Sequence, residues 1–81
     1  MHIVAIHSVS DPQQFWSGSP ELPEGTTLQS ALPNDDGTKG VCVWESDSVE
    51  TVSRIVENAA GEISRTEYFE VNANQAMGLP D

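Results

Sequence analysis

The apolar positions along the chain follow two different periods. Short β-branched and alternating runs predict four strands, over residues 2–7, 26–32, 40–45 and 66–71. Residues 48–60 instead place apolar side chains at spacings of three and four, which is typical of an amphipathic helix. A shorter helix is expected to begin after Asp11 and Pro12 and to end before Gly18. The chain therefore predicts two helices among four strands.

Turn and cap residues separate these elements. The run Asn34-Asp35-Asp36-Gly37 predicts a hairpin between the second and third strands, because glycine supplies the positive φ that such a turn needs. Asp47, with Glu50 three residues later, predicts the start of the long helix, and Gly61 stands at its expected end. Residues 1–72 then form one domain, and residues 73–81 are expected to be a C-terminal tail.

The element order βαββαβ predicts an α+β fold. With right-handed crossovers and a central hairpin, it gives the ferredoxin-like arrangement, an antiparallel sheet of strand order 4-1-3-2 with both helices on one face.

The period of two along each strand divides the sheet into two faces. The more aliphatic set is expected to pack under the helices: Val4, Ile6, Leu28, Leu32, Val41, Val43, Phe69 and Val71. The opposite set is mixed in chemistry: Ile3, Ala5, His7, Gln29, Ala31, Cys42, Trp44, Tyr68 and Glu70. Because a face left to water does not normally carry so many apolar residues on its central strands, we expect the second face to meet a second copy of the chain.

This combination resembles a known superfamily. The element order, the small size and two apolar sheet faces, with the segments 41–50 and 67–71, are similar to short bacterial members of the dimeric α+β barrel superfamily, some of them related to nickel-binding proteins. The resemblance implies a homodimer whose sheets pack face to face. It implies no single chemistry, because the superfamily includes cofactor-free monooxygenases, haem-dependent enzymes and proteins with no known reaction.

Composition narrows the classes of partner. The chain has 13 acidic and 3 basic residues, a net charge of -10, and its cations are not clustered, so nucleic acid and anionic membranes are poor partners. Neither a secretory signal nor a transmembrane span is expected, and the sequence is typical of a soluble cytoplasmic protein. The single cysteine excludes an internal disulfide, which leaves a partner subunit as the aid to stability that so small a domain needs.

Three residues on the second face could act chemically. His7 could serve as a base or a ligand, although a hydrogen-bonded histidine is the commoner case. Cys42 is more typical of a small buried hydrophobe than of a nucleophile. With Glu70, these two could form a transition-metal site, but their spacing matches no known motif, so we expect neither a metal nor a cofactor.

The aromatic residues allow two interpretations each. Trp44 and Tyr68 could line an apolar ligand pocket, but interface packing is favoured. Phe15 and Trp16 could edge a cleft between helix and sheet, although core packing is the simpler interpretation, above all for Phe15.

The preferred hypothesis is a non-catalytic homodimer that binds a small ligand or serves as an accessory module. Its ligand-binding or dimer face would contain His7, Gln29, Cys42, Trp44, Tyr68 and Glu70. One alternative is a cofactor-independent monooxygenase or isomerase acting on an aromatic or polyketide-like substrate, with His7 or Tyr68 transferring the proton. A second alternative is a transition-metal (nickel-like) binding protein.

Overall fold

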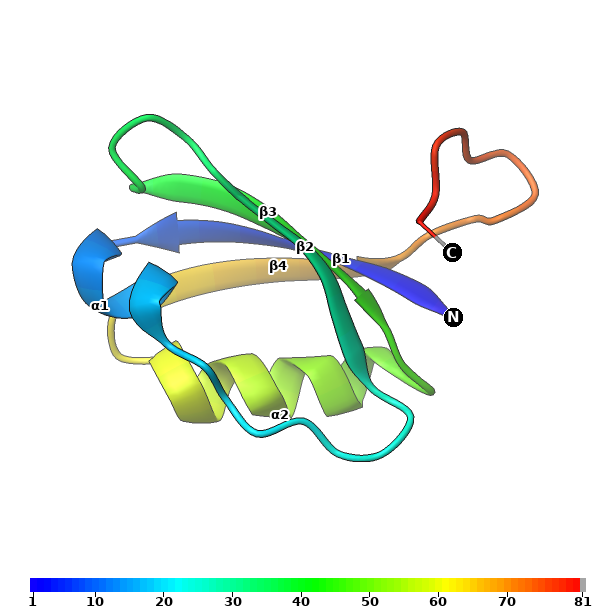
Figure 1. The fold of residues 1–81 in the computed structure, drawn as a ribbon, viewed down its shortest axis with the longest axis horizontal. Coiled ribbons are helices and arrows are strands. Elements are labelled where there is room, and N and C mark those ends of the chain that lie inside the picture. Colours follow the sequence, from blue (N-terminus) through cyan, green and yellow to red (C-terminus); the bar gives the residue numbers. More distant parts are fainter. Residues whose placement is uncertain (81) are drawn as a thin grey trace.

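The computed structural model describes residues 1–80 and contains the six expected elements in the expected order (Figure 1). The strands are β1 (His2–Val9), β2 (Thr27–Pro33), β3 (Lys39–Glu45) and β4 (Ser64–Glu70), and the helices are α1 (Pro12–Ser17) and α2 (Val49–Ala60). Residue 81, the last of the expected tail, lies outside the described residues.

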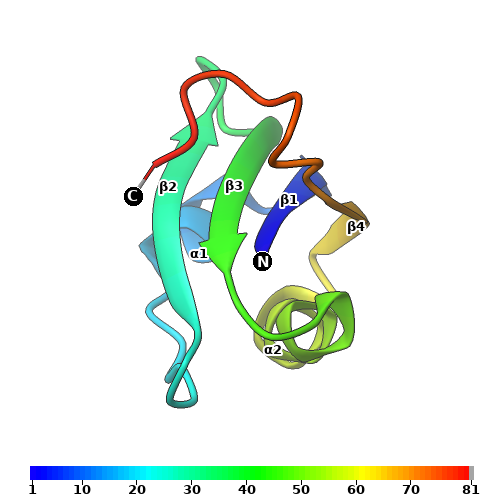
Figure 2. The same cartoon turned by 90° about the vertical axis from the view of Figure 1, so that its right-hand side faces the viewer.

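The four strands form one antiparallel sheet. β1 pairs with β3 on one side and β4 on the other, and β2 pairs with β3. The resulting order β2-β3-β1-β4 is 4-1-3-2 when it is read from the β4 edge. Figure 2 shows the sheet curving over the side on which α1 and α2 lie. The architecture is thus α+β and compatible with a ferredoxin-like fold.

The assignment of the two sheet faces from the sequence is wrong. The helices cover the face that was expected to meet a second copy of the chain. We call it the helix-covered face, and its buried members include Ile3, Ala5, His7, Cys42 and Trp44. Val52 and Val56 of α2 complete this core. The other side, which we call the open face, carries the aliphatic set that was expected beneath the helices: Val4, Ile6, Leu32, Val41, Val43 and Phe69.

Side-chain size explains the inversion. Ala5 and Cys42 are small, and Gly40 has no side chain, so the helices can approach this face closely. A Cβ on Gly40 would lie 2.4 Å from Cη2 of Trp16, which shows that the indole occupies the space that the glycine leaves. The β-branched residues on the open face leave no comparable space.

A β-bulge in β2 accounts for a second error. The register between β2 and β3 shifts between Leu28 and Ser30, so that Leu28 pairs with Trp44 but Leu32 pairs with Val41. A bulge inserts one extra residue and changes the face on which the following side chains lie. Leu28 and Leu32, expected on one face, therefore lie on opposite faces.

The ends of the elements follow local hydrogen bonding. Asp11 caps α1, accepting from the backbone N–H of Gln14 at 3.2 Å, as expected from the sequence. The cap of α2 is Ser48 and not Asp47, because the Ser48 hydroxyl accepts from the N–H of Thr51 at 3.1 Å. Gly37 in the hairpin turn has a φ of 76°, which confirms the reason for glycine there.

The tail returns toward the start of β1. Nε2 of His2 lies 3.1 Å from the carbonyl oxygen of Pro80, and the tail forms turns and no helix within residues 71–80. No helix in residues 1–80 has the length and apolar character needed to cross a membrane.

Candidate functional site

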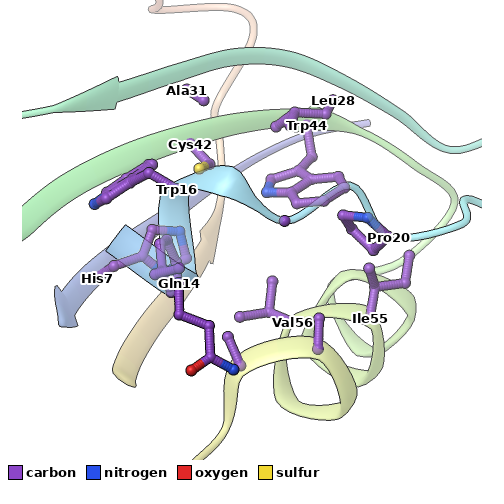
Figure 3. A pocket seen from close by; sticks show the side chains of 14 residues that line it. His7, Gln14, Trp16, Pro20, Leu28, Ala31, Cys42, Trp44, Ile55 and Val56 are labelled. Atoms are coloured by element: carbon purple, nitrogen blue, oxygen red, sulfur yellow. The ribbon is translucent and has the colours of Figure 1, made fainter. Parts of the chain in front are cut away.

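A cavity of about 120 Å³ lies beneath β2 and β3, between the two helices (Figure 3). Its origin is the shortness of α1. Six helical residues extend only about 9 Å, whereas the seven-residue strands beside it extend about 23 Å. The chain then leaves the helix through Gly18 and Pro20, two exposed residues that line the cavity. The end of the helix-covered face next to β2 is therefore left without a helix packed fully across it.

The walls of the cavity are mostly apolar, with Gln14 and His7 as polar members of the lining. Leu28, Ala31, Cys42 and Trp44 contribute the sheet side, and α2 contributes the opposite wall: Ile55, Val56, Ala59 and Ala60. No Asp, Glu, Lys or Arg belongs to the lining among residues 1–80. Since transfer of a charge into such surroundings is costly, the cavity favours an uncharged occupant.

An aromatic cluster forms the end of the cavity near α1. The rings of Phe15 and Trp16 lie 4.6 Å apart between centroids, and the imidazole of His7 lies 4.8 Å from Phe15. Nε1 of Trp16 donates a 2.7 Å hydrogen bond to the carbonyl of Gly37, which ties α1 to the hairpin turn. Phe15 and Trp16 thus line the cavity, the less favoured interpretation, while Trp16 also packs against the core.

His7 is buried, with 1% of its surface exposed, and its two ring nitrogens differ in environment. Nδ1 lies 2.8 Å from the hydroxyl of Thr66, whereas Nε2 has no hydrogen-bond partner within residues 1–80. Burial lowers the pKa of the imidazole below its ordinary value, and the charge of Glu57 opposes part of this shift. His7 is therefore a neutral imidazole at neutral pH.

Trp44 presents a second polar atom without a partner. The residue is 3% exposed, and its Nε1 makes no hydrogen bond within residues 1–80. A buried donor left without an acceptor costs about 1–3 kcal/mol. Trp44 and His7 both line the cavity, and each has one buried nitrogen without a hydrogen bond within residues 1–80. This destabilisation therefore arises twice around one small space.

Cys42 lies on the same wall, but its thiol is unreactive. Burial raises the pKa of its thiol to about 11. Because the thiolate is the reactive form, the side chain acts here as a small apolar group, as the sequence favoured.

The remaining predicted site residues do not line this cavity. The hydroxyl of Tyr68 donates to Oε2 of Glu57 at 3.0 Å, and burial together with that bond raises the pKa of Tyr68 to about 12. Gln29 lies half-buried at the bulge, and Glu70 is exposed on the outer strand β4. His7, Cys42 and Trp44 are therefore the part of the predicted site that the fold brings together.

The metal site that the sequence left open as an alternative does not form. Among residues 1–80, no three His, Cys, Asp or Glu side chains lie close enough to hold a metal ion, so the trio of His7, Cys42 and Glu70 is excluded. Glu70 belongs to the outer strand β4, and β1 lies between it and Cys42.

Thr66 belongs to this site although no sequence pattern singles it out. It is the register partner of His7 across β1 and β4, and only that register identifies it. The β1–β4 pairing could not be set from one sequence, because both strands carry apolar residues on both faces.

Comparison of the chain with protein-family models, curated proteins and solved structures finds no match.

Proposed function

We propose that this protein binds a small, uncharged, mostly apolar molecule in the cavity between α1, α2 and the sheet, without chemical change, and that it does so as a homodimer. The observation that carries the ligand-binding proposal is the cavity itself, which has a volume of about 120 Å³, is lined mostly by apolar residues and has no charged side chain in its lining among residues 1–80. Apolar walls with a few polar groups that fix orientation are typical of small-molecule sites.

The size of the cavity limits the ligand. An engineered apolar cavity of about 150 Å³ binds benzene. At about 120 Å³, with an opening past Gly18 and Pro20, this cavity suits a molecule of similar size or one end of a longer molecule.

The two tryptophans allow a direct test by proton–nitrogen NMR, with cyclopentanone and methylenecyclopentane as probes. Trp44 lines the cavity and its indole N–H has no partner within residues 1–80, whereas that of Trp16 is bonded to Gly37. We expect at least one probe to shift the Trp44 indole signal and the amides of Cys42 and Val56 in a saturable manner. Absence of saturable shifts with both probes contradicts ligand binding.

A matched pair of variants locates the binding. Ala59 lines the cavity and Asn58 does not, although both are exposed residues of α2. Ala59→Leu is expected to weaken probe binding by filling the opening, while Asn58→Leu leaves it unchanged. If the two variants weaken probe binding equally, the probes bind at another site.

The open face supports the homodimer. Ile6, Leu32 and Phe69 on this face are 41%, 60% and 49% exposed. Its charged residues balance, with Lys39 and Arg65 against Glu45 and Glu67, although the chain as a whole carries -10. Two copies can therefore approach through this face with less repulsion than through any acidic surface. This proposal replaces the dimer face expected from the sequence, which the helices cover.

Sedimentation equilibrium at micromolar concentration tests the dimer. We expect a mass of about twice 8.7 kDa for the unaltered protein. Leu32→Lys should produce monomers, whereas Leu22→Lys, the same change at an exposed loop residue away from the sheet, should leave the dimer intact. A monomeric unaltered protein contradicts the proposal.

Proton transfer is a second candidate function, favoured by one observation. His7 lines the cavity, its imidazole is neutral as a general base requires, and its Nε2 has no partner within residues 1–80. Nε2 would take a proton from the carbon next to a ketone carbonyl and return a solvent deuteron to that carbon in D₂O. Tyr68 has no part in it, because its hydroxyl is bonded to Glu57.

Exchange of the cyclopentanone α-protons for deuterium, followed by NMR, tests this second candidate. Exchange faster than with free imidazole at equal concentration, and lost in His7→Gln, supports a base. Exchange no faster than with imidazole removes the enzyme alternative and leaves the binding function.

A further inference from the structure

The two edges of the sheet differ in how well they are protected against pairing with another strand. The β2 edge contains the bulge between Leu28 and Ser30 and ends at Pro33. Bulges and prolines are devices by which edge strands avoid such pairing. β4 has neither, and all seven of its residues pair regularly with β1. Figure 2 shows β4 at the outer edge of the sheet, with α2 beneath it and not beyond it. The β4 edge is therefore the one open to a further strand.

Alternate residues of β4 direct their main-chain groups outward. The N–H of Val71, one residue past β4, donates to the carbonyl oxygen of His2 at 2.8 Å. Because hydrogen-bonded pairs alternate along an antiparallel ladder, the odd-numbered residues of β4 bond to β1. The main-chain N–H and C=O groups of Thr66 and Tyr68 therefore point away from β1, toward the free edge.

Arg65 and Glu67 place charges of opposite sign next to each other on the open face of β4. Phe69 follows them on the same face, and all three residues are exposed. Neither Arg65 nor Glu67 forms an ion pair within residues 1–80. When two identical strands pair about a twofold axis, residue i meets residue j of the partner and j meets i. A cation and an anion two positions apart can therefore form two ion pairs across one such axis.

The main-chain directions and these charges together select one register. Outward groups meet only when even-numbered residues lie opposite even-numbered residues, so the axis must pass through a residue. An axis at Arg65 sets two cations directly opposite each other, and an axis at Glu67 sets two carboxylates opposite, which is destabilising. Axes farther along the strand leave both charges unpaired. An axis at Thr66 places Arg65 opposite the partner's Glu67, in pairs whose side chains lie closest together. It also sets Ile63 opposite the partner's Phe69, which is 49% exposed in the single chain.

We propose that the β4 edge pairs with the β4 edge of a second copy of the chain, antiparallel and centred on Thr66, so that two four-stranded sheets join into one. This interface goes beyond the proposed open-face dimer and does not depend on it. Ser64 and Tyr68 of each copy, with Thr66 at the axis, supply about six main-chain hydrogen bonds. Because the contact is small and each chain carries a net charge of -10, association is expected at about 0.1–1 mM and not at micromolar concentration.

The variant Leu32→Lys isolates this contact, because it is expected to remove the open-face dimer and leaves the β4 edge unaltered. In about 0.15 M salt, which screens repulsion between distant charges, sedimentation equilibrium should show single chains at micromolar concentration and dimers at millimolar concentration. The amide protons of Thr66 and Tyr68 should exchange with D₂O about threefold more slowly at the higher concentration. Those of Arg65 and Glu67, which bond to β1 in the single chain, are the internal reference.

Charge reversals in the Leu32→Lys background test the register. Arg65→Glu sets carboxylates against each other in both pairs and should raise the dissociation constant about tenfold. Lys39→Glu changes the net charge by the same amount on the same face, but on β3 and away from the edge, so it should have little effect. The double variant Arg65→Glu, Glu67→Arg restores opposite charges and should restore association.

The outcomes separate this contact from the proposed functions. If Leu32→Lys remains a single chain at millimolar concentration, the edge pairing is overturned, whatever mass the unaltered protein has at micromolar concentration. Equal effects of Arg65→Glu and Lys39→Glu, or no recovery in the double variant, also overturn it. Amide exchange needs no charge reversal, so it decides the case in which those variants do not fold: exchange of Thr66 and Tyr68 that is independent of concentration overturns the proposal.

Discussion

Nδ1 of His7 lies 2.8 Å from the hydroxyl of Thr66, and the two residues are register partners on adjacent strands. This contact holds the imidazole ring in place, and Nε2 has no hydrogen-bond partner within residues 1–80. Thr66→Val keeps the shape of the side chain but leaves Nδ1 unpaired as well. We expect it to lower the free energy of unfolding in urea by about 1–3 kcal/mol.

Thr66→Ser is the matched control, because it retains the hydroxyl and removes only a methyl group. Its loss should be the smaller of the two. Equal losses in the two variants would mean that packing of the methyl group, and not the hydrogen bond, stabilises this position.

The lowered pKa of His7 predicts a pH dependence of stability. Because the folded pKa lies below that of the unfolded chain, the unfolded state binds the proton first as pH falls. Stability should therefore decrease as pH drops below about 6.5, the ordinary histidine value, and level off below the folded pKa. In His7→Gln this component should disappear, which unfolding free energies measured at several pH values will show.

The His7 ring resonances, followed through a pH titration, provide a direct reading of the same shift. A midpoint at or above the ordinary value, or an unchanged pH dependence in His7→Gln, contradicts burial as the dominant cause. The difference between the two proteins is the relevant quantity, because both contain the second histidine, His2.

Gly40 and Trp16 form the contact through which α1 is seated on the sheet. A Cβ on residue 40 would lie 2.4 Å from the indole, so Gly40→Ala forces the ring to move. Displacement of a packed ring costs about 1–3 kcal/mol, and the melting temperature should fall accordingly. The Trp16 indole proton should also shift as its bond to Gly37 is disturbed.

Gly18→Ala is the control for that substitution. The nearest atom to a Cβ on residue 18 is the carbonyl oxygen of Phe15 at 3.5 Å, an ordinary contact. Its effect is expected to stay within about 0.5 kcal/mol, as for surface changes in general. Similar melting temperatures for the two variants would show that Trp16 adjusts without cost.

Local signals made much of the fold predictable. Asp11 before Pro12 located the start of α1, the apolar stripe of residues 48–60 located α2, and the Asp-Gly pair located the hairpin. Each of these signals depends on residues near one another in sequence. The order of elements then restricts the topology, because few connections are short and right-handed.

The candidate site depends on contacts between residues far apart in the sequence, which local sequence patterns do not predict. Both faces of the sheet are apolar, so the period of two could not show which one the helices cover. The decisive features were Gly40, which admits Trp16, and the bulge that separates Leu28 from Leu32. His7 was selected for its chemistry, but its partner Thr66 appears only when β4 is placed in register.

Cys42 provides a test of how tightly the cavity wall is closed. It is 5% exposed, and burial raises the pKa of its thiol to about 11, so little thiolate forms at pH 8 in the folded protein. We expect a disulfide reagent such as Ellman's reagent to modify Cys42 slowly in buffer and rapidly in urea. Moving the chain's only thiol to an exposed loop, in the double variant Cys42→Ala, Ser19→Cys, should restore rapid modification in buffer.

Because Cys42 lines the cavity, saturating cyclopentanone should slow its modification further without affecting Cys42→Ala, Ser19→Cys. Rapid modification of the unaltered protein in buffer would show that the sheet wall of the cavity opens to solvent.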